Sequence, residues 1–527
     1  MSDNLSNWRS ELQANLADEA IQIDSVGTDL EQWYIMGEYW LRFAELAHQQ
    51  KGRWVAGWAE QITDAFIVNA CFAYQGEYLW VRTRLDEEKP KLPSQATVYP
   101  AASRSERHTQ DMFGIHFIEH PDARAWLRHR AWGKHDYPLR KGFPLQGNNP
   151  EKITPPDTDY QFVKARGSGV YEIPVGPVHA GIIEPGHFRF QAAGETILNL
   201  EERLGYVHKG IEKLAEGRTA DELVRLAGRI SGDSTVAHSW AACRAMEQAA
   251  DIVISPRAAF IRGLLCERER IANHLGDIGA ICNDVGFAFA QMQFSRLREY
   301  WQRTQAKVFG HRLLMDCIVP GGVKVNISAE DCQLFLQELK DLRKELDGII
   351  PAMDLNSSLE DRLFTTGYLS PETAATFSTV GYVGRSSGQD FDVRRDTPYA
   401  PYDQLDLKVV VEQQGDVASR VWVRVNEVFA SIKLLKQMLT QLPEGDLLTA
   451  WKVPAEDKEG LAMIEGWRGE IMTYVRFDSD NKISRFYARD PSVFGFLSLE
   501  KIVLNNIVPD FPVCNKSVNP SYSGNDL

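Results

Sequence analysis

Two short segments of the chain have the spacing of a metal site but unsuitable side chains. The segments are Arg229-Ile230-Ser231-Gly232-Asp233-Ser234, followed by His238, and Asn519-Pro520-Ser521-Tyr522-Ser523-Gly524. Each holds two positions in the C-x-x-C spacing with which paired cysteines bind a soft metal. These four positions are Ser231, Ser234, Ser521 and Gly524. A hydroxyl is a poor substitute for a soft thiolate, and glycine has no side chain to offer. We therefore expect no soft-metal centre here.

The sequence gives little support for any other kind of metal site. The four positions, with Asp233, Asp526 and His238, form an oxygen-rich set that would suit magnesium or calcium; the alternative is a vestigial cavity filled by packing and water. None of the seven cysteines lies in a C-x-x-C pair, so zinc-ribbon, thioredoxin and ferredoxin motifs are absent. We expect buried free thiols, with Cys514 as a less favoured remnant ligand.

The predicted helices and strands that hold these segments divide the chain into two regions. Residues 1–50 are predicted to be helical, with apolar residues at helical spacing between Trp33 and Leu46. Residues 66–74 and 78–85 are rich in strand-forming residues around a Gln75-Gly76 turn, which predicts a hairpin. A stretch rich in glycine and proline, 147–170, is the expected linker.

The second region is predicted to be mostly helical from about 206 to 350. Ala259–Cys282 places apolar residues on one broad face, and 330–350 and 419–442 have a similar pattern. Residues 171–190 and 471–477 have strand character. We expect one small sheet built from the two ends of this region, which would bring the two serine segments together.

The serine segments resemble the R-x-C-G-x-C-x-x-x-H and D-P-C-x-x-C motifs of nickel–iron hydrogenases, with the cysteines lost. Residues 105–115 and 136–141 resemble the signature of the 30-kDa-type subunit of respiratory complex I, with His108 in place of an acidic residue. Residues 173–189 and 206–214 resemble the start of the 49-kDa-type subunit. The order is most similar to the fused large subunit of hydrogenase-4 and formate hydrogenlyase.

The resemblance implies an α+β chain of two domains. Residues 1–146 would form a small α+β domain like the 30-kDa subunit, and 171–527 a mainly helical domain like the 49-kDa subunit and the hydrogenase large subunit, with a small β-sheet. It further implies a cytoplasmic subunit, peripheral to the inner (plasma) membrane. The implied partners are an iron–sulfur small subunit of the complex I 20-kDa type, a ferredoxin-like subunit and antiporter-like membrane subunits.

In complex I the cavity between this subunit and the iron–sulfur small subunit binds a quinone head, so the resemblance makes quinone the candidate ligand. A proton donor is needed because quinone reduction takes up two protons. The candidate cavity residues are His179, Glu184, His187, Arg229, His238 and Tyr522, with His179 and His187 as candidate quinone contacts. The tyrosine of the 49-kDa subunit aligns with Gly232, so that donor is missing. Structural hydrogen bonds in a turn are the alternative role of both histidines.

Six arginines match family positions, and several of them are expected to lie in a buried polar layer, each paired with a carboxylate such as Glu267, Glu299 or Asp392. Structural ion pairing is the expected role, and the alternative is a part in a proton or coupling path. The six arginines are Arg229, Arg270, Arg298, Arg385, Arg394 and Arg420. Arg394 could correspond to the arginine that lies over the metal in the hydrogenases.

A basic stretch of the chain contains two tryptophans, Trp126 and Trp132. Its cationic residues are Arg124, Arg128, Arg130, Lys134, Arg140 and Lys141. Because this stretch lies within the 30-kDa-type signature, we expect it to form an interface with another subunit and not a nucleic-acid-binding surface.

Composition sets outer limits on function. The net charge of −14 argues against nucleic-acid binding, and no apolar run is long enough to span a membrane. No nucleotide-binding motif is present, so NADH chemistry would belong to partner subunits.

The leading hypothesis is that this chain is a subunit of an energy-converting, complex-I-like complex and that the subunit itself lacks a nickel–iron centre. It would shape a quinone or other acceptor cavity, or couple redox change to ion translocation. The alternatives are a purely structural subunit and a hydrogenase with unconventional ligands.

Overall fold

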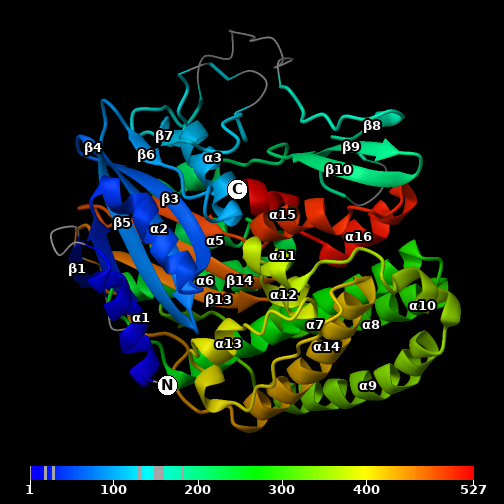
Figure 1. Cartoon of the computed structure of the whole chain (residues 1–527). Helices are drawn as coiled ribbons and strands as arrows, with labels where there is room; N and C mark the ends of the chain where they lie inside the picture. The colour runs from blue at the N-terminus through cyan, green and yellow to red at the C-terminus, as the bar shows by residue number, and fades with distance from the viewer. Residues whose placement is uncertain are drawn as a thin grey trace.

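The computed structural model shows a β-rich N-terminal region packed on a larger helical region (Figure 1). It describes the whole chain except residues 1, 17–20, 27–29, 129–131, 134, 148–159, 180–182, 453 and 455. The mixed α+β class predicted from the sequence is confirmed. Residues 148–159, half of the predicted linker, lie outside the described part.

The N-terminal region is built on a five-stranded sheet with strand order β1-β2-β5-β4-β3. Its strands are antiparallel except for the parallel pair β2 and β5. Its elements are α1 (Ser2–Ala14), β1 (Ile21–Val26), β2 (Leu30–Ile35), α2 (Trp40–Gln49), β3 (Arg53–Ile62), β4 (Ala65–Tyr74), β5 (Glu77–Asp86), β6 (Lys91–Pro93), α3 (Ser103–Phe113) and β7 (His116–Ile118). The predicted hairpin is confirmed as β4 and β5. Gln75 and Gly76 both have positive φ, as a two-residue hairpin turn requires.

The prediction that residues 1–50 are helical is wrong for strands β1 and β2, and the helix predicted between Trp33 and Leu46 is therefore wrong in its first half. Residues 30–35 form strand β2, in which Trp33 pairs with Val81 of β5, and α2 begins only at Trp40. The pairing joins residues almost fifty positions apart, so local periodicity could not reveal it. From Trp40 onward the periodicity holds, and α2 buries Phe43 and Ala47 against the sheet.

The second region is mainly helical, as predicted. Its helices are α4 (Ile211–Ala215), α5 (Ala220–Ala227), α6 (Thr235–Ala249), α7 (Pro256–Asp284), α8 (Ala288–Phe309), α9 (Ala329–Asp354), α10 (Ser357–Leu363), α11 (Pro371–Thr376), α12 (Gly381–Ser386), α13 (Val393–Asp396), α14 (Val417–Thr440), α15 (Ser492–Ile502), α16 (Phe511–Val518) and α17 (Tyr522–Asp526). Helix α7 is buried on nearly every side, not along one face, because α6, α8, α14 and α16 all pack against it.

The strands of this region form two separate three-stranded sheets, so the expectation of one sheet built from both ends is wrong. One sheet contains β8 (Val170–Val175), β9 (His187–Ala193) and β10 (Thr196–Arg203); the other contains β13 (Glu459–Gly466), β14 (Gly469–Phe477) and β15 (Ile483–Arg489). A further short pair is β11 (Ile318–Val319) with β12 (Gly322–Val323). The two serine segments meet instead through α17 and the loop before α6.

The β13–β15 sheet fastens the two regions together. Arg485 and Arg489 of β15 donate hydrogen bonds to the carbonyls of Ala59 and Val55 in β3. Trp58 of β3 stacks on the Tyr487 ring at 5.5 Å between centroids. These buried contacts tie the N-terminal sheet to the β13–β15 sheet, and the turn between β13 and β14 of that sheet carries a residue of the cavity described below.

The buried arginine layer is confirmed for three of the six predicted members: Arg270, Arg385 and Arg394 pair with carboxylates in the helical core. Arg420 is buried but donates to Ser517 and to two carbonyls. Glu299 is wrong as a buried partner, because it pairs with Arg303 on the exposed side of α8. The seven cysteines are free thiols, and all but Cys332 are buried. No helix in the described part is long and apolar enough to cross a bilayer.

Candidate functional site

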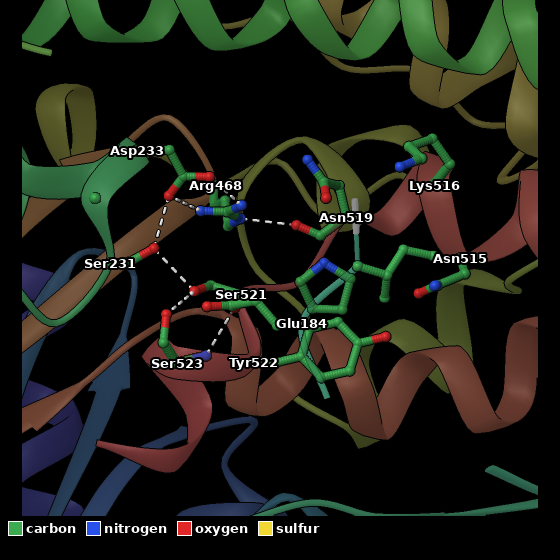
Figure 2. Close-up of a pocket in the computed structure, with 13 residues that line it drawn as sticks. Glu184, Ser231, Asp233, Arg468, Asn515, Lys516, Asn519, Ser521, Tyr522 and Ser523 are labelled. Atoms are coloured by element: carbon green, nitrogen blue, oxygen red, sulfur yellow. Dashed lines mark hydrogen bonds and ion pairs between the residues drawn. The ribbon is translucent and has the colours of Figure 1, made fainter. Parts of the chain in front are cut away.

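The two serine segments meet at a polar cavity of about 210 Å³ (Figure 2). The hydroxyl oxygens of Ser231 and Ser521 lie 2.8 Å apart, although the residues are 290 positions apart in the chain. The juxtaposition predicted from the sequence is therefore confirmed. The cavity is lined by Ile183, Glu184, Ser231, Gly232, Asp233, Arg468, Asn515, Lys516, Asn519, Pro520, Ser521, Tyr522 and Ser523.

Local turns present each segment to the cavity. A short 3-10 turn, Gly232–Ser234, leads directly into α6. On the other side, Asn519 adopts the left-handed conformation that ends α16, a role in which asparagine is favoured. Ser521 then caps α17 by accepting a hydrogen bond from the Gly524 N–H.

The hydroxyl groups of the two serine segments are engaged with one another and with their neighbours. Ser231 donates to Asp233 at 2.6 Å, and Ser521 accepts from Gly524 at 2.9 Å. The Ser234 oxygen accepts from Arg468 at 3.2 Å. This donor set supplies no thiolate, so it does not fit the soft-ligand requirement of a nickel–iron centre.

The fourth position, Gly524, faces a carboxylate. A Cβ atom at Gly524 would lie 2.7 Å from Cγ of Asp490 and 2.9 Å from its Oδ2. Asp490 is held in place by His238 Nε2 at 2.8 Å and by the Ser492 N–H at 2.8 Å. Burial alone would raise the pKa of Asp490, but His238 and Arg468 lower it to about 2. The carboxylate is thus a fixed anion where a fourth ligand would begin.

Arg468 is the main cavity residue that sequence reasoning did not assign to the site. Its guanidinium binds both carboxylate oxygens of Asp233, at 2.8 and 2.7 Å, and donates to the Asn519 carbonyl at 2.7 Å. Burial favours the neutral acid, but Arg468 holds the pKa of Asp233 below its usual value. The signal that could have found it is the segment Arg468-Gly469-Glu470, which matches a family pattern. Arg394 is no relic over this site, since it binds Asp392 and Glu267 in the helical core.

The predicted loop before β9 does reach the C-terminal motif. Glu184 accepts a hydrogen bond from the Ser523 N–H at 3.1 Å. A Cβ atom at Gly186 would lie 2.6 Å from the Tyr522 ring, so this loop packs directly on that ring. The Tyr522 side chain is aimed toward Asn515 (Figure 2), and burial raises the pKa of its phenol. Tyr522 and Glu184 are the predicted candidates that line the cavity.

The other four candidates lie outside the cavity lining. His179 Nε2 contacts the Gly186 carbonyl at 2.8 Å, and His187 Nδ1 contacts the Gly176 carbonyl at 3.2 Å. Both contacts are hydrogen bonds within the loop, and burial lowers the pKa of His187. His238 is engaged with Asp490, as described above. Arg229 turns outward to a bidentate pair with Asp316, where its side chain is 43% exposed.

Three family patterns match successive parts of the chain. Residues 38–149 match the 30 Kd subunit of respiratory-chain NADH dehydrogenase, and residues 284–459 match its 49 Kd subunit. Residues 209–276 match nickel-dependent hydrogenase. The first serine segment lies within this last range, and so does the first half of α7.

Known relatives align over most of the chain. The chain is 33% identical to formate hydrogenlyase subunit 5 of Escherichia coli, covering 85% of this chain and 79% of the relative. It is 32% identical to a fused NADH-quinone oxidoreductase subunit of Phocaeicola vulgatus, covering 77% and 81%. Among solved structures, a chain of an archaeal membrane-bound sulfane sulfur reductase has the same fold, with a TM-score of 0.65 at 24% identity. That match covers 68% of this chain and 99% of the other.

Proposed function

This chain belongs to the family of fused complex I 30-kDa and 49-kDa subunits and nickel–iron hydrogenase large subunits, and we propose that it works without a nickel–iron centre. Family members are subunits of membrane-bound respiratory complexes. One observation carries the proposal: three hydroxyls and a glycine stand at the ligand positions, and Asp490 faces the fourth. Serine does not ionise near neutral pH to replace bridging thiolates.

Metal analysis of the natively purified complex tests this proposal. We expect nickel far below one atom per copy of this chain. A co-purified cysteine-containing hydrogenase from the same preparation is the positive control, since it shows that nickel was available to the cells. One nickel atom per chain would overturn the proposal and revive a hydrogenase with unconventional ligands.

The cavity itself is proposed to receive the polar head of an electron acceptor, with quinone as the candidate. Tyr522 supports this, because a buried phenol with a raised pKa keeps its proton and donates to a carbonyl. Glu184 lines the same cavity and supplies a second ionisable group. Quinone reduction consumes two protons, so a cavity lined by a phenol that can donate a proton suits it.

Photolabelling with an azido-quinone tests the acceptor site in the intact complex. We expect label in the peptides around Glu184 and Tyr522, removed by excess unmodified quinone. Tyr522→Phe keeps the ring that packs on Gly186 and should reduce the labelling. Tyr99→Phe is the matched control, because it removes a buried hydroxyl bound to the Gly52 carbonyl outside the cavity. Unlabelled cavity peptides in an intact complex would favour a purely structural subunit.

The remaining assignments follow from the family. We propose an iron–sulfur small subunit, a ferredoxin-like subunit and antiporter-like membrane subunits as partners. We further propose a location on the cytoplasmic face of the inner membrane, held there by these partners. Affinity purification under mild detergent, followed by identification of the co-purified chains, tests both points. Recovery of the chain alone from gently solubilised membranes would contradict them.

A further inference from the structure

Behind the cavity, the helical core encloses a group of charges that we call the core ionic cluster. Its members are Glu267, Arg270 and His274 on α7, Arg385 on α12, Asp392 and Arg394 at the start of α13, Glu427 on α14 and Glu465 on β13. All of these side chains are at most 4% exposed. Water therefore does little to screen or stabilise their charges.

The core ionic cluster contains more carboxyl groups than cations. Three guanidinium groups face four carboxyl groups. His274 does not supply the missing charge, because burial lowers the pKa of its imidazole. A fully ionised cluster would thus bury one uncompensated negative charge, which is costly in a low-dielectric interior.

Three of the four carboxylates are well compensated. Glu267 accepts from Arg270, Arg394, Tyr402 and Ser431. Asp392 forms a bidentate pair with Arg394 at 3.0 and 2.7 Å. Glu427 accepts two N–H groups of Arg385, at 2.9 and 2.7 Å, and contacts His274 at 2.8 Å.

Glu465 is the carboxyl group with the weakest compensation. Its Oε1 accepts from Arg385 at 2.9 Å, but that guanidinium is already shared with Glu427. Among the residues that the structure describes, the one donor to its Oε2 is the Val393 backbone N–H, at 3.2 Å. The unbalanced negative charge of the cluster therefore falls on Glu465, and the Oε2 oxygen has room for a proton.

The ionisable groups around Glu465 come from every neighbouring element. They are Cys266, Glu267 and Arg270 from α7, Arg385 from α12, Asp392 and Arg394 from α13, Glu427 from α14 and the Tyr399 hydroxyl, which accepts from the Glu465 N–H. Burial and the Asp392 charge raise the pKa of Glu465, against the opposing pull of Arg385 and Arg394, to about 7.

We propose that the core ionic cluster is a proton-binding site, which takes up and releases one proton at a carboxyl oxygen of Glu465. The step is a simple protonation: a carboxylate and one proton from solvent give a carboxylic acid, with no change in oxidation state. The β13–β14 hairpin places this site close behind the cavity wall, because Glu465 and Arg468 are three residues apart on it. The inference does not depend on which acceptor the cavity receives.

Infrared spectroscopy of the intact complex tests the proposal. The C=O stretch of a protonated carboxylic acid is separate from the carboxylate bands, so the acid can be titrated directly. We expect a band that is present at low pH and lost on alkalinisation, with a midpoint near 7. Glu465→Gln should remove the component that titrates near 7. The components of other buried acids, such as Glu106 with a pKa of about 8, should remain. Glu299→Gln, on the exposed side of α8, should leave the band unchanged.

A second variant keeps the test decisive if Glu465→Gln does not fold. Glu465→Asp retains a titratable carboxyl group at altered distance from Arg385, so the band should persist with a shifted midpoint. The proposal is wrong if the band is absent near neutral pH, or if it keeps its intensity and midpoint in both Glu465 variants. Because no quinone is added, these outcomes are independent of the labelling experiment.

Discussion

Gly524→Ala is the substitution that most directly tests how tightly Asp490 packs against the Gly524 backbone. The new Cβ atom would lie 2.7 Å from Cγ of Asp490 and 3.0 Å from Oδ1, well inside van der Waals contact. Asp490 cannot move away freely, because His238 Nε2 and the Ser492 N–H hold it, each at 2.8 Å. The clash must therefore shift the α17 backbone or break one of these buried hydrogen bonds.

The size of the effect follows from these two costs. Overpacking a well-packed site by one methyl group costs about 1–3 kcal/mol, and a buried polar group left without its partner costs about 1–3 kcal/mol. Since relaxation shares the strain between them, we expect Gly524→Ala to lower the free energy of unfolding by about 2–4 kcal/mol. The assay is the shift of the urea midpoint of the purified protein at constant m-value.

Two comparisons isolate the cause. Gly348→Ala, where a Cβ on α9 would meet nothing within 4 Å, should instead stabilise by about 0.5–1 kcal/mol through helix propensity. In an Asp490→Ala background the further cost of Gly524→Ala should largely disappear, because the clashing group is gone. A Gly524→Ala protein within about 0.5 kcal/mol of wild type would refute the view that Asp490 packs tightly against Gly524.

Three further predictions concern other parts of the site and the core. Glu106 has a pKa raised by burial to about 8, so its stabilising contribution is complete below about pH 4.5 and is lost as pH rises through 8. In the wild type the free energy of unfolding should fall by at most about 1.4 kcal/mol per pH unit between about pH 4.5 and 8. Urea titrations at several pH values should show a weaker pH dependence over this range for Glu106→Gln. Gly186→Ala should cost about 1–3 kcal/mol by pushing on the Tyr522 ring, and Tyr522→Leu should relieve that cost in a double-mutant cycle. Arg468→Met should destabilise by about 1–3 kcal/mol, less than for a fully buried pair because the Asp233 side chain is 33% exposed; an unchanged urea midpoint would show that the pair contributes nothing.

The sequence alone determined the elements whose signals are local. The β4–β5 hairpin followed from two strand-forming runs around Gln75-Gly76, and most of α7 from apolar residues at helical spacing. The contact between Ser231 and Ser521 could be predicted because the two serine segments resemble the two halves of one metal-ligand set. Such halves can act together only if the fold brings them side by side. The family could be recognised in the same way, from the order of its motifs.

The side chains that face the cavity could not be predicted without the tertiary structure. Strand β2 depends on pairing with β5, a long-range hydrogen-bonded contact that overrides local helical periodicity. His179 was a candidate by residue type, but it contacts a carbonyl of its own loop. Arg468, by contrast, reaches the cavity from a hairpin more than 230 residues beyond Ser231 in the chain. Likewise, the surplus carboxyl group Glu465 becomes visible only when the buried charges of five separate elements are counted together. Side-chain direction and charge balance are properties of packed neighbours, and these neighbours come from distant parts of the chain.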